Sequence, residues 1–261
     1  MRFALKQLKP ARTPDEPEVL DVELGGTRHA VPVRRSKRAR RMTLKIDSRL
    51  GGPVLTLPRR FSVTEARRFL ARHAGWLESR MDQLPAPVPF VDGGIFPLRG
   101  EPVRILHRPG RGTVSVMADG PEPVVSVHGG AEHLARRLTD WLKDEARCDL
   151  TRSVERHAAT LGVSPSAIRV RDTGTRWGSC SSRRTLSFSW RLVLAPPSVL
   201  DYLAAHEVAH LKHMNHGPKF WKLVALLDPD YREAEDWLKR DGPTLFAVGR
   251  GAGDAKETPA A

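Results

Sequence analysis

Residues 200–211 have the sequence LDYLAAHEVAHL, and this stretch constrains the fold of the chain more than any other. Pro196-Pro197 directly before it is typical of a helix start. Leu203, Val208 and their apolar neighbours predict that this helix is buried against a core. His206 and His210 lie four residues apart, so on a helix they leave the same face about 6 Å apart along its axis.

Two imidazoles at this spacing, with an acidic residue after the first, are typical of a zinc site that activates water. Burying polar side chains costs free energy unless they have partners. This favours metal-binding histidines over histidines that only fill the core. We expect His206 and His210 to be Zn²⁺ ligands. Glu207 lies beside the metal and is the expected catalytic base, because its carboxylate can take a proton from water and pass it on.

A catalytic zinc site has three protein ligands and one open position, so the sequence must supply a third ligand. His213 would stand about 10 Å from His206 along a continued helix, too far to share one ion easily. His216 is the better candidate, because residues 215–218 carry the Asn, Gly and Pro that end one helix and begin the next. Two acidic residues on a helix predicted over residues 230–240 are the alternatives: Glu233 and Glu235.

Upstream, residues 176–181 (RWGSCS) place small side chains next to a tryptophan and before the β-like run 185–189. This indicates a strand that passes close to another group, and such a strand can hold an extended peptide by β-addition. A tight turn with a core tryptophan is the alternative. With three histidines at hand, we expect Cys180 to be a small buried residue rather than a ligand. Arg176 and Tyr231 are candidate donors to an oxyanion.

The N-terminal part of the chain predicts a small antiparallel sheet. Residues 19–24 and 28–33 carry β-forming side chains around Gly25-Gly26, which is typical of a hairpin. Residues 42–46 and 54–57 give two further strand patterns, separated by a Gly-Gly-Pro turn.

Helical patterns follow. Ser62 with Glu65 three residues later predicts a capping box, and apolar side chains at helical spacing up to Met81 predict one helix after it. The longest helical pattern covers residues 131–161, with Gly162 as its stop.

Charge is distributed unevenly along the chain. The 43 Lys and Arg against 30 Asp and Glu give a net charge of +13, and residues 1–100 carry 20 basic against 10 acidic residues. Residues 34–41 (RRSKRARR) hold six basic side chains in eight. Such a run attracts polyanions, but it is also typical of an edge strand that carries cations to block pairing, and both interpretations stay open.

Several classes of protein are excluded or disfavoured. No apolar run approaches the roughly 18 residues of a membrane helix, and the first residues lack the apolar core of a secretory signal. The two cysteines, Cys148 and Cys180, form no disulfide framework. We therefore expect a cytoplasmic protein without a membrane partner.

Several motifs occur in the order found in the YgjP-like metallopeptidases, which are relatives of the SprT-like proteins. The motifs are Ser36–Arg41 with Met42–Ile46, Trp177–Cys180, Leu194–Pro197, Tyr202, His206–Leu211, Asn215-His216 and Phe220-Trp221. The resemblance covers about residues 30–240. It implies that His206, His210 and His216 bind zinc and that Glu207 is the catalytic base. Gly217 stands where the family often has Ser, and the Asn often found near position 189 is missing; neither position is a ligand.

Together these features predict an α+β protein with a zincin-like metallopeptidase core that carries the zinc motif on a buried helix. The expected parts are a flexible arm (1–18), a basic β-rich region with one helix (19–95), the core (96–245) and a flexible tail (246–261).

The predicted function is zinc-dependent hydrolysis of a peptide or protein. One alternative is hydrolysis of a nucleoside triphosphate held by arginines, although the chain has no P-loop sequence. Another is a nucleic-acid-associated protease or binding protein that uses the basic N-terminal region.

Overall fold

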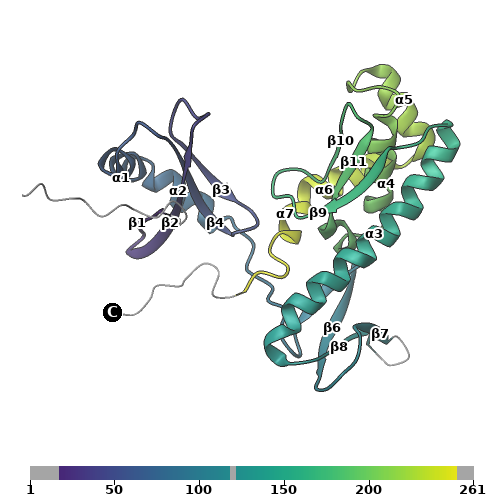
Figure 1. Cartoon of the computed structure of the whole chain (residues 1–261), viewed down its shortest axis with the longest axis horizontal. Helices are drawn as coiled ribbons and strands as arrows, with labels where there is room; N and C mark the ends of the chain where they lie inside the picture. Colours follow the sequence, from purple (N-terminus) through teal and green to yellow (C-terminus); the bar gives the residue numbers. More distant parts are fainter. Residues whose placement is uncertain (1–17, 118–121, 252–261) are drawn as a thin grey trace, which may run out of the picture. The chain divides into compact units, whose positions relative to one another are not determined.

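The computed structural model describes residues 18–117 and 122–251 of the 261-residue chain (Figure 1). Contacts between these residues divide them into two compact units. The first unit contains residues 18–46 and 53–82, and the second contains residues 47–52 and 83–251. Almost all of the expected arm and residues 252–261 of the expected tail lie outside the described residues, whereas Phe246–Val248 are buried in the second unit.

The first unit contains a four-stranded sheet in the order β1-β2-β4-β3. Its strands are β1 (Glu18–Leu24), β2 (Thr27–Ser36), β3 (Thr43–Asp47) and β4 (Gly52–Pro58). The predicted hairpin is present, because β1 and β2 pair antiparallel around Gly25 and Gly26. The sheet is mixed rather than antiparallel, however, since β4 lies next to β2 and runs parallel to it. The chain leaves β2, forms the edge strand β3 and then returns between the two.

Two helices, not one, follow the sheet: α1 (Val63–Arg72) and α2 (Ala74–Asp82). The predicted capping box is present, with the Ser62 hydroxyl accepting from the Glu65 amide and the Glu65 carboxylate accepting from the Ser62 amide. The expected single helix breaks at His73, whose φ of −108° is not helical and whose Nδ1 lies 2.8 Å from the Phe69 carbonyl oxygen. Leu77 is buried, but Trp76 is exposed.

The second unit contains two sheets. One has the order β5-β6-β8-β7 and the other the order β10-β11-β9. Their strands are β5 (Ile95–Leu98), β6 (Glu101–Arg108), β7 (Ser115–Met117), β8 (Val124–His128), β9 (Ala167–Arg171), β10 (Gly178–Cys180) and β11 (Thr185–Ser189). The long helix α3 (Leu134–Leu161) runs from the first of these sheets to the second (Figure 1), and Gly162 ends it in the left-handed region, as predicted.

The His-Glu-Val-Ala-His sequence begins in α4 (Pro197–Ala209) and ends at its C-cap, His210. Helices α5 (Pro218–Leu227) and α6 (Tyr231–Arg240) pack against α4, and the short α7 (Gly242–Leu245) packs on α6. Two short 3₁₀ helices, η1 (Ala131–His133) and η2 (Trp190–Leu194), precede α3 and α4. Nine of the 13 residues of α4 are buried. This helix ends at Ala209, because the turn that follows tightens onto the Val208 and Ala209 carbonyls.

No helix in the described ranges combines the length and apolar character needed to cross a membrane.

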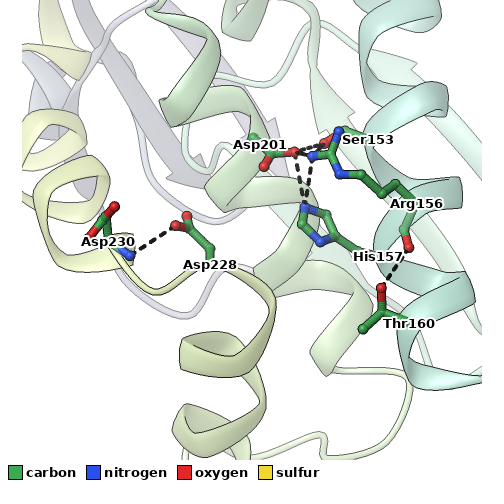
Figure 2. A network of polar contacts seen from close by, with 7 residues as sticks. All are labelled: Ser153, Arg156, His157, Thr160, Asp201, Asp228 and Asp230. Carbon is green, nitrogen blue, oxygen red and sulfur yellow. Dashed lines mark hydrogen bonds and ion pairs between the residues drawn. The ribbon is translucent and has the colours of Figure 1, made fainter.

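A polar network attaches α4 to α3 (Figure 2). The Asp201 carboxylate on α4 accepts hydrogen bonds from Ser153, Arg156 and His157 on α3, with His157 Nε2 at 3.0 Å. Burial raises the pKa of Asp201, but the hydrogen bonds from His157 and Ser153 outweigh it and hold the pKa below its ordinary value. The His157 side chain is 4 % exposed and the Asp201 side chain 32 %, so the His157 end of this contact is shielded from water.

We expect Asp201→Asn to lower the free energy of unfolding by about 1–3 kcal/mol at pH 7, because it leaves buried donors without a charged acceptor. The folded pKa of Asp201 is lowered, so its stabilisation is complete above the unfolded value of about 3.9 and is lost as the pH falls through the folded value. The difference between wild type and variant in urea denaturation should therefore shrink from pH 7 towards pH 3.

Asp144→Asn is the matched control, because Asp144 pairs with Arg147 on the exposed side of α3. Its effect should stay below about 0.5 kcal/mol. Equal effects of the two substitutions would contradict the structural role of Asp201.

Candidate metal centre

Three histidines converge at the end of α4. His206 comes from α4, His210 is the C-cap residue of that helix, and His216 comes from the connection to α5. One possible ligand nitrogen from each lies within 4.8 Å of the others, and this is the one such group found in the described part of the chain. The Nε2 atoms of His206 and His216 are 3.1 Å apart. Two nitrogens at this separation, each about 2.05 Å from a zinc ion, would subtend about 100°, close to tetrahedral.

Hydrogen bonds and burial favour the neutral, ligating form of His206 and His210. His210 Nδ1 lies 2.9 Å from the His213 carbonyl oxygen, to which it must donate, so its Nε2 keeps a free lone pair. His206 Nδ1 lies 3.5 Å from the Tyr202 hydroxyl. Burial, followed by the neighbouring His210 and His216, lowers the pKa of His206 to about 3. Burial also lowers the pKa of His210.

Glu207 is a buried carboxylate with an unsatisfied oxygen. The residue is 4 % exposed, and its Oε2 has no hydrogen-bond partner among the described residues. Burial raises the pKa of Glu207 to about 8, and the charge of Arg176 opposes that rise in part. An unpartnered buried carboxylate is costly. Beside three imidazoles, it fits a site that takes a divalent cation and a water molecule.

Strand β10 passes directly against this carboxylate. A Cβ at Gly178 would lie 2.4 Å from Glu207 Oε1, so a larger residue at this point of the strand would force the Glu207 side chain to move. The close passage predicted from the small residues at 176–181 is therefore present. Within the described chain, β10 is an edge strand that pairs only with β11. Cys180, at its end, is partly buried and lies outside the histidine group.

Phe220 is the common neighbour of the three histidines. It is fully buried, and its ring centroid lies 4.9, 4.4 and 4.7 Å from those of His206, His210 and His216. Sequence reasoning gave Phe220 no structural role. The available signal was its place in an aromatic pair just after the Gly-Pro that begins α5.

A second aromatic layer surrounds this group. Tyr231 stacks on Tyr202 and on Trp221, with centroid distances of 6.4 and 5.5 Å. Trp221 lies 5.9 Å from the rings of both His206 and His216. The imidazoles are thus held by packing on several sides.

The other candidates from the sequence lie outside the histidine group. His213 contributes a carbonyl rather than its ring. Glu233 is exposed, and Glu235 pairs with Lys239 at 3.0 Å. The Tyr231 hydroxyl accepts from Arg232 at 3.3 Å, while Arg176 is near enough for its charge to act on Glu207.

We expect Phe220→Leu to weaken the binding of a divalent metal by about 10- to 100-fold, because the imidazoles lose the surface that orients them. Competition with a chromophoric zinc chelator measures the affinity. Phe188→Leu is the control: Phe188 is equally buried on β11, in the same core. Both variants should lose similar stability, about 1–2 kcal/mol. Equal zinc affinities would show that Phe220 only fills space.

Comparisons with known proteins agree with a metal-dependent enzyme. The family model described as YgjP-like, metallopeptidase domain, matches residues 40–241. Among solved structures, the metallopeptidase zymogens abylysin of Pyrococcus abyssi and jannalysin of Methanocaldococcus jannaschii each share 22% sequence identity with the chain. They align with TM-scores of 0.33 and 0.32, over 36% and 35% of this chain and 95% and 94% of their own. A search of the curated proteins found no match.

Proposed function

Because the chain belongs to the YgjP-like metallopeptidase family, we propose that it is a zinc-dependent peptidase with Glu207 as its general base. The observation that supports this most is the meeting of three imidazoles with a buried, unpartnered carboxylate. His206, His210 and His216 would hold the zinc ion. Bound there, zinc would lower the pKa of a coordinated water to about 7 and polarise the substrate carbonyl.

Glu207 has the position and environment of a general base. It takes a proton from the attacking water and passes it to the amine that leaves. Burial moves the pKa of Glu207 from its ordinary range towards neutral pH, where a base of this kind works best. The contact with Gly178 limits where the carboxylate can turn.

Strand β10 is the proposed docking site for the substrate. An extended peptide can pair with the free edge of β10 through main-chain hydrogen bonds. Because Gly178 lies in this strand and touches Glu207, a peptide paired along β10 would run past the proposed base. This supports a peptide or protein as substrate over a nucleotide.

Glu207→Gln should keep about one equivalent of metal and lose about 10²- to 10⁴-fold in peptide hydrolysis, because the amide cannot accept the proton. Elemental analysis measures the metal, and a library of quenched fluorescent peptides measures hydrolysis. Full activity in this variant would refute the mechanism. Nucleoside triphosphates are tested in parallel. If the protein hydrolysed them and not peptides, the proposed function would be phosphoanhydride hydrolysis instead of peptide hydrolysis.

His210→Ala should lose the stoichiometric metal, and with it all activity, because two imidazoles hold zinc weakly. Chelation of the wild type should give the same loss, reversed by added zinc. A variant that retains one equivalent of tightly bound zinc would remove His210 from the ligand set.

Gly178→Ala should reduce kcat by about 10²-fold with unchanged metal content, because the added Cβ displaces the Glu207 carboxylate. Gly75→Ala is the control, since a Cβ there meets no atom within 4 Å and the residue lies in α2. If the Gly178 variant kept wild-type kcat, the close contact between Gly178 and Glu207 would have no role in catalysis.

A further inference from the structure

A second feature of the molecule lies in the first unit and has no part in the proposed peptide hydrolysis. Residues 24–64 contain eleven Lys and Arg and a single acidic residue, Asp47. Asp47 is only 4 % exposed, so it contributes little to neutralising the surface. This part of the chain therefore presents almost purely positive charge to the solvent.

The fold gathers this charge at one place. The parallel strands β2 and β4 end together, with Ser36 opposite Pro58. At these ends, Arg35 of β2 donates to the Phe61 carbonyl at 3.0 Å, and Arg60 donates to the Arg40 carbonyl at 3.1 Å. These bonds tie the end of β2 and the β2–β3 connection to the β4–α1 connection. The basic cluster thus formed consists of Arg34, Arg35, Lys37, Arg38, Arg40, Arg41, Arg59 and Arg60.

The cluster is ordered and accessible. The Ser36 hydroxyl accepts from the amides of Arg38 and Ala39, which fixes the turn after β2. All eight basic residues are exposed. Six of them form no ion pair with any residue in the described ranges: Arg34, Lys37, Arg38, Arg40, Arg41 and Arg59.

Protection of a sheet edge does not explain these charges. The edge strands of the described sheet are β1 and β3, whereas β2 and β4 are its interior strands. Most of the cluster lies beyond the strand ends, in the two connections. Of the two interpretations that the sequence left open, attraction of a polyanion is the one that the topology favours.

We propose that the basic cluster binds the phosphate backbone of nucleic acid without reading its base sequence. Seven of the eight side chains are arginines, whose planar guanidinium groups match phosphate oxygens in pairs. Contacts to phosphate position a protein on nucleic acid but carry no sequence information. The nearby N-terminus of α1 adds no anion site, because Ser62 and Glu65 already cap it.

A membrane surface fits the cluster less well. Binding to lipid headgroups usually needs apolar side chains that enter the interface beside the charges. The large exposed apolar residues of the described chain all lie outside residues 34–41 and 58–62.

The test uses the full-length protein and a fluorescein-labelled 20-base-pair DNA duplex, with fluorescence anisotropy at several salt concentrations. If about six phosphates are contacted, affinity should fall by about 10³-fold between 50 and 200 mM salt. Replacement of Arg34, Lys37, Arg38, Arg40, Arg41 and Arg59 by Gln should remove most of this salt dependence and weaken binding at least 100-fold at 50 mM. Arg35 and Arg60 stay, because their hydrogen bonds hold the two connections together.

The control variant removes the same charge from the second unit, where six residues whose side chains are at least 40 % exposed are replaced by Gln: Arg136, Lys143, Arg147, Arg152, Lys239 and Arg240. It should lose less than tenfold in affinity. An equal loss in both variants would overturn the proposal in favour of a net-charge effect. Unchanged binding in the cluster variant, or binding to phosphatidylserine vesicles but not to the duplex, would overturn it as well.

Peptide hydrolysis by the cluster variant separates this proposal from the peptidase. The variant should bind metal and cleave peptides as the wild type does, because none of the six residues lies in the second unit. Circular dichroism should show an unchanged fold.

Discussion

The burial of α4 is the constraint on which the candidate site depends. Most of this helix is shielded from water, so His206 and Glu207 sit in a medium that disfavours charge. Burial consequently lowers the pKa of His206 and raises the pKa of Glu207. On the surface, a helix of the same sequence would have solvated side chains with ordinary pKa values. Strand β10 would then not pass close to the Glu207 carboxylate.

Elements on several sides of α4 hold the helix and its site residues in place. Asp201 attaches the helix to α3 on one side, and Phe220 of α5 supports the three imidazoles on another. Gly178 of β10 closes the space around the Glu207 carboxylate. The first unit differs in character, because its sheet carries a concentration of arginines and its core is separate. The chemistry and the excess charge of this chain therefore belong to different units.

Local interactions explain which parts of the fold could be predicted from the sequence. The hairpin at Gly25-Gly26, the capping box at Ser62 and the end of α3 at Gly162 each depend on a few neighbouring residues. The position of β4 between β2 and β3 depends on pairing between distant strands, which alternation of side chains does not specify. The break at His73 was missed because the apolar spacing continues through it, while the ring of His73 packs on Phe69 and bonds its carbonyl.

The sequence by itself determined the residue types of the candidate site and their helical spacing, because His206, Glu207 and His210 lie within two turns of one helix. It also determined the charge of the N-terminal region and favoured His216 over His213, Glu233 and Glu235. Only the tertiary structure decided that Phe220 touches all three imidazoles, that Gly178 meets Glu207, and that Arg59 and Arg60 join the run at 34–41. Each of these depends on segments far apart in the chain, brought together by the burial of apolar surface, which is not directional and leaves little trace in local sequence.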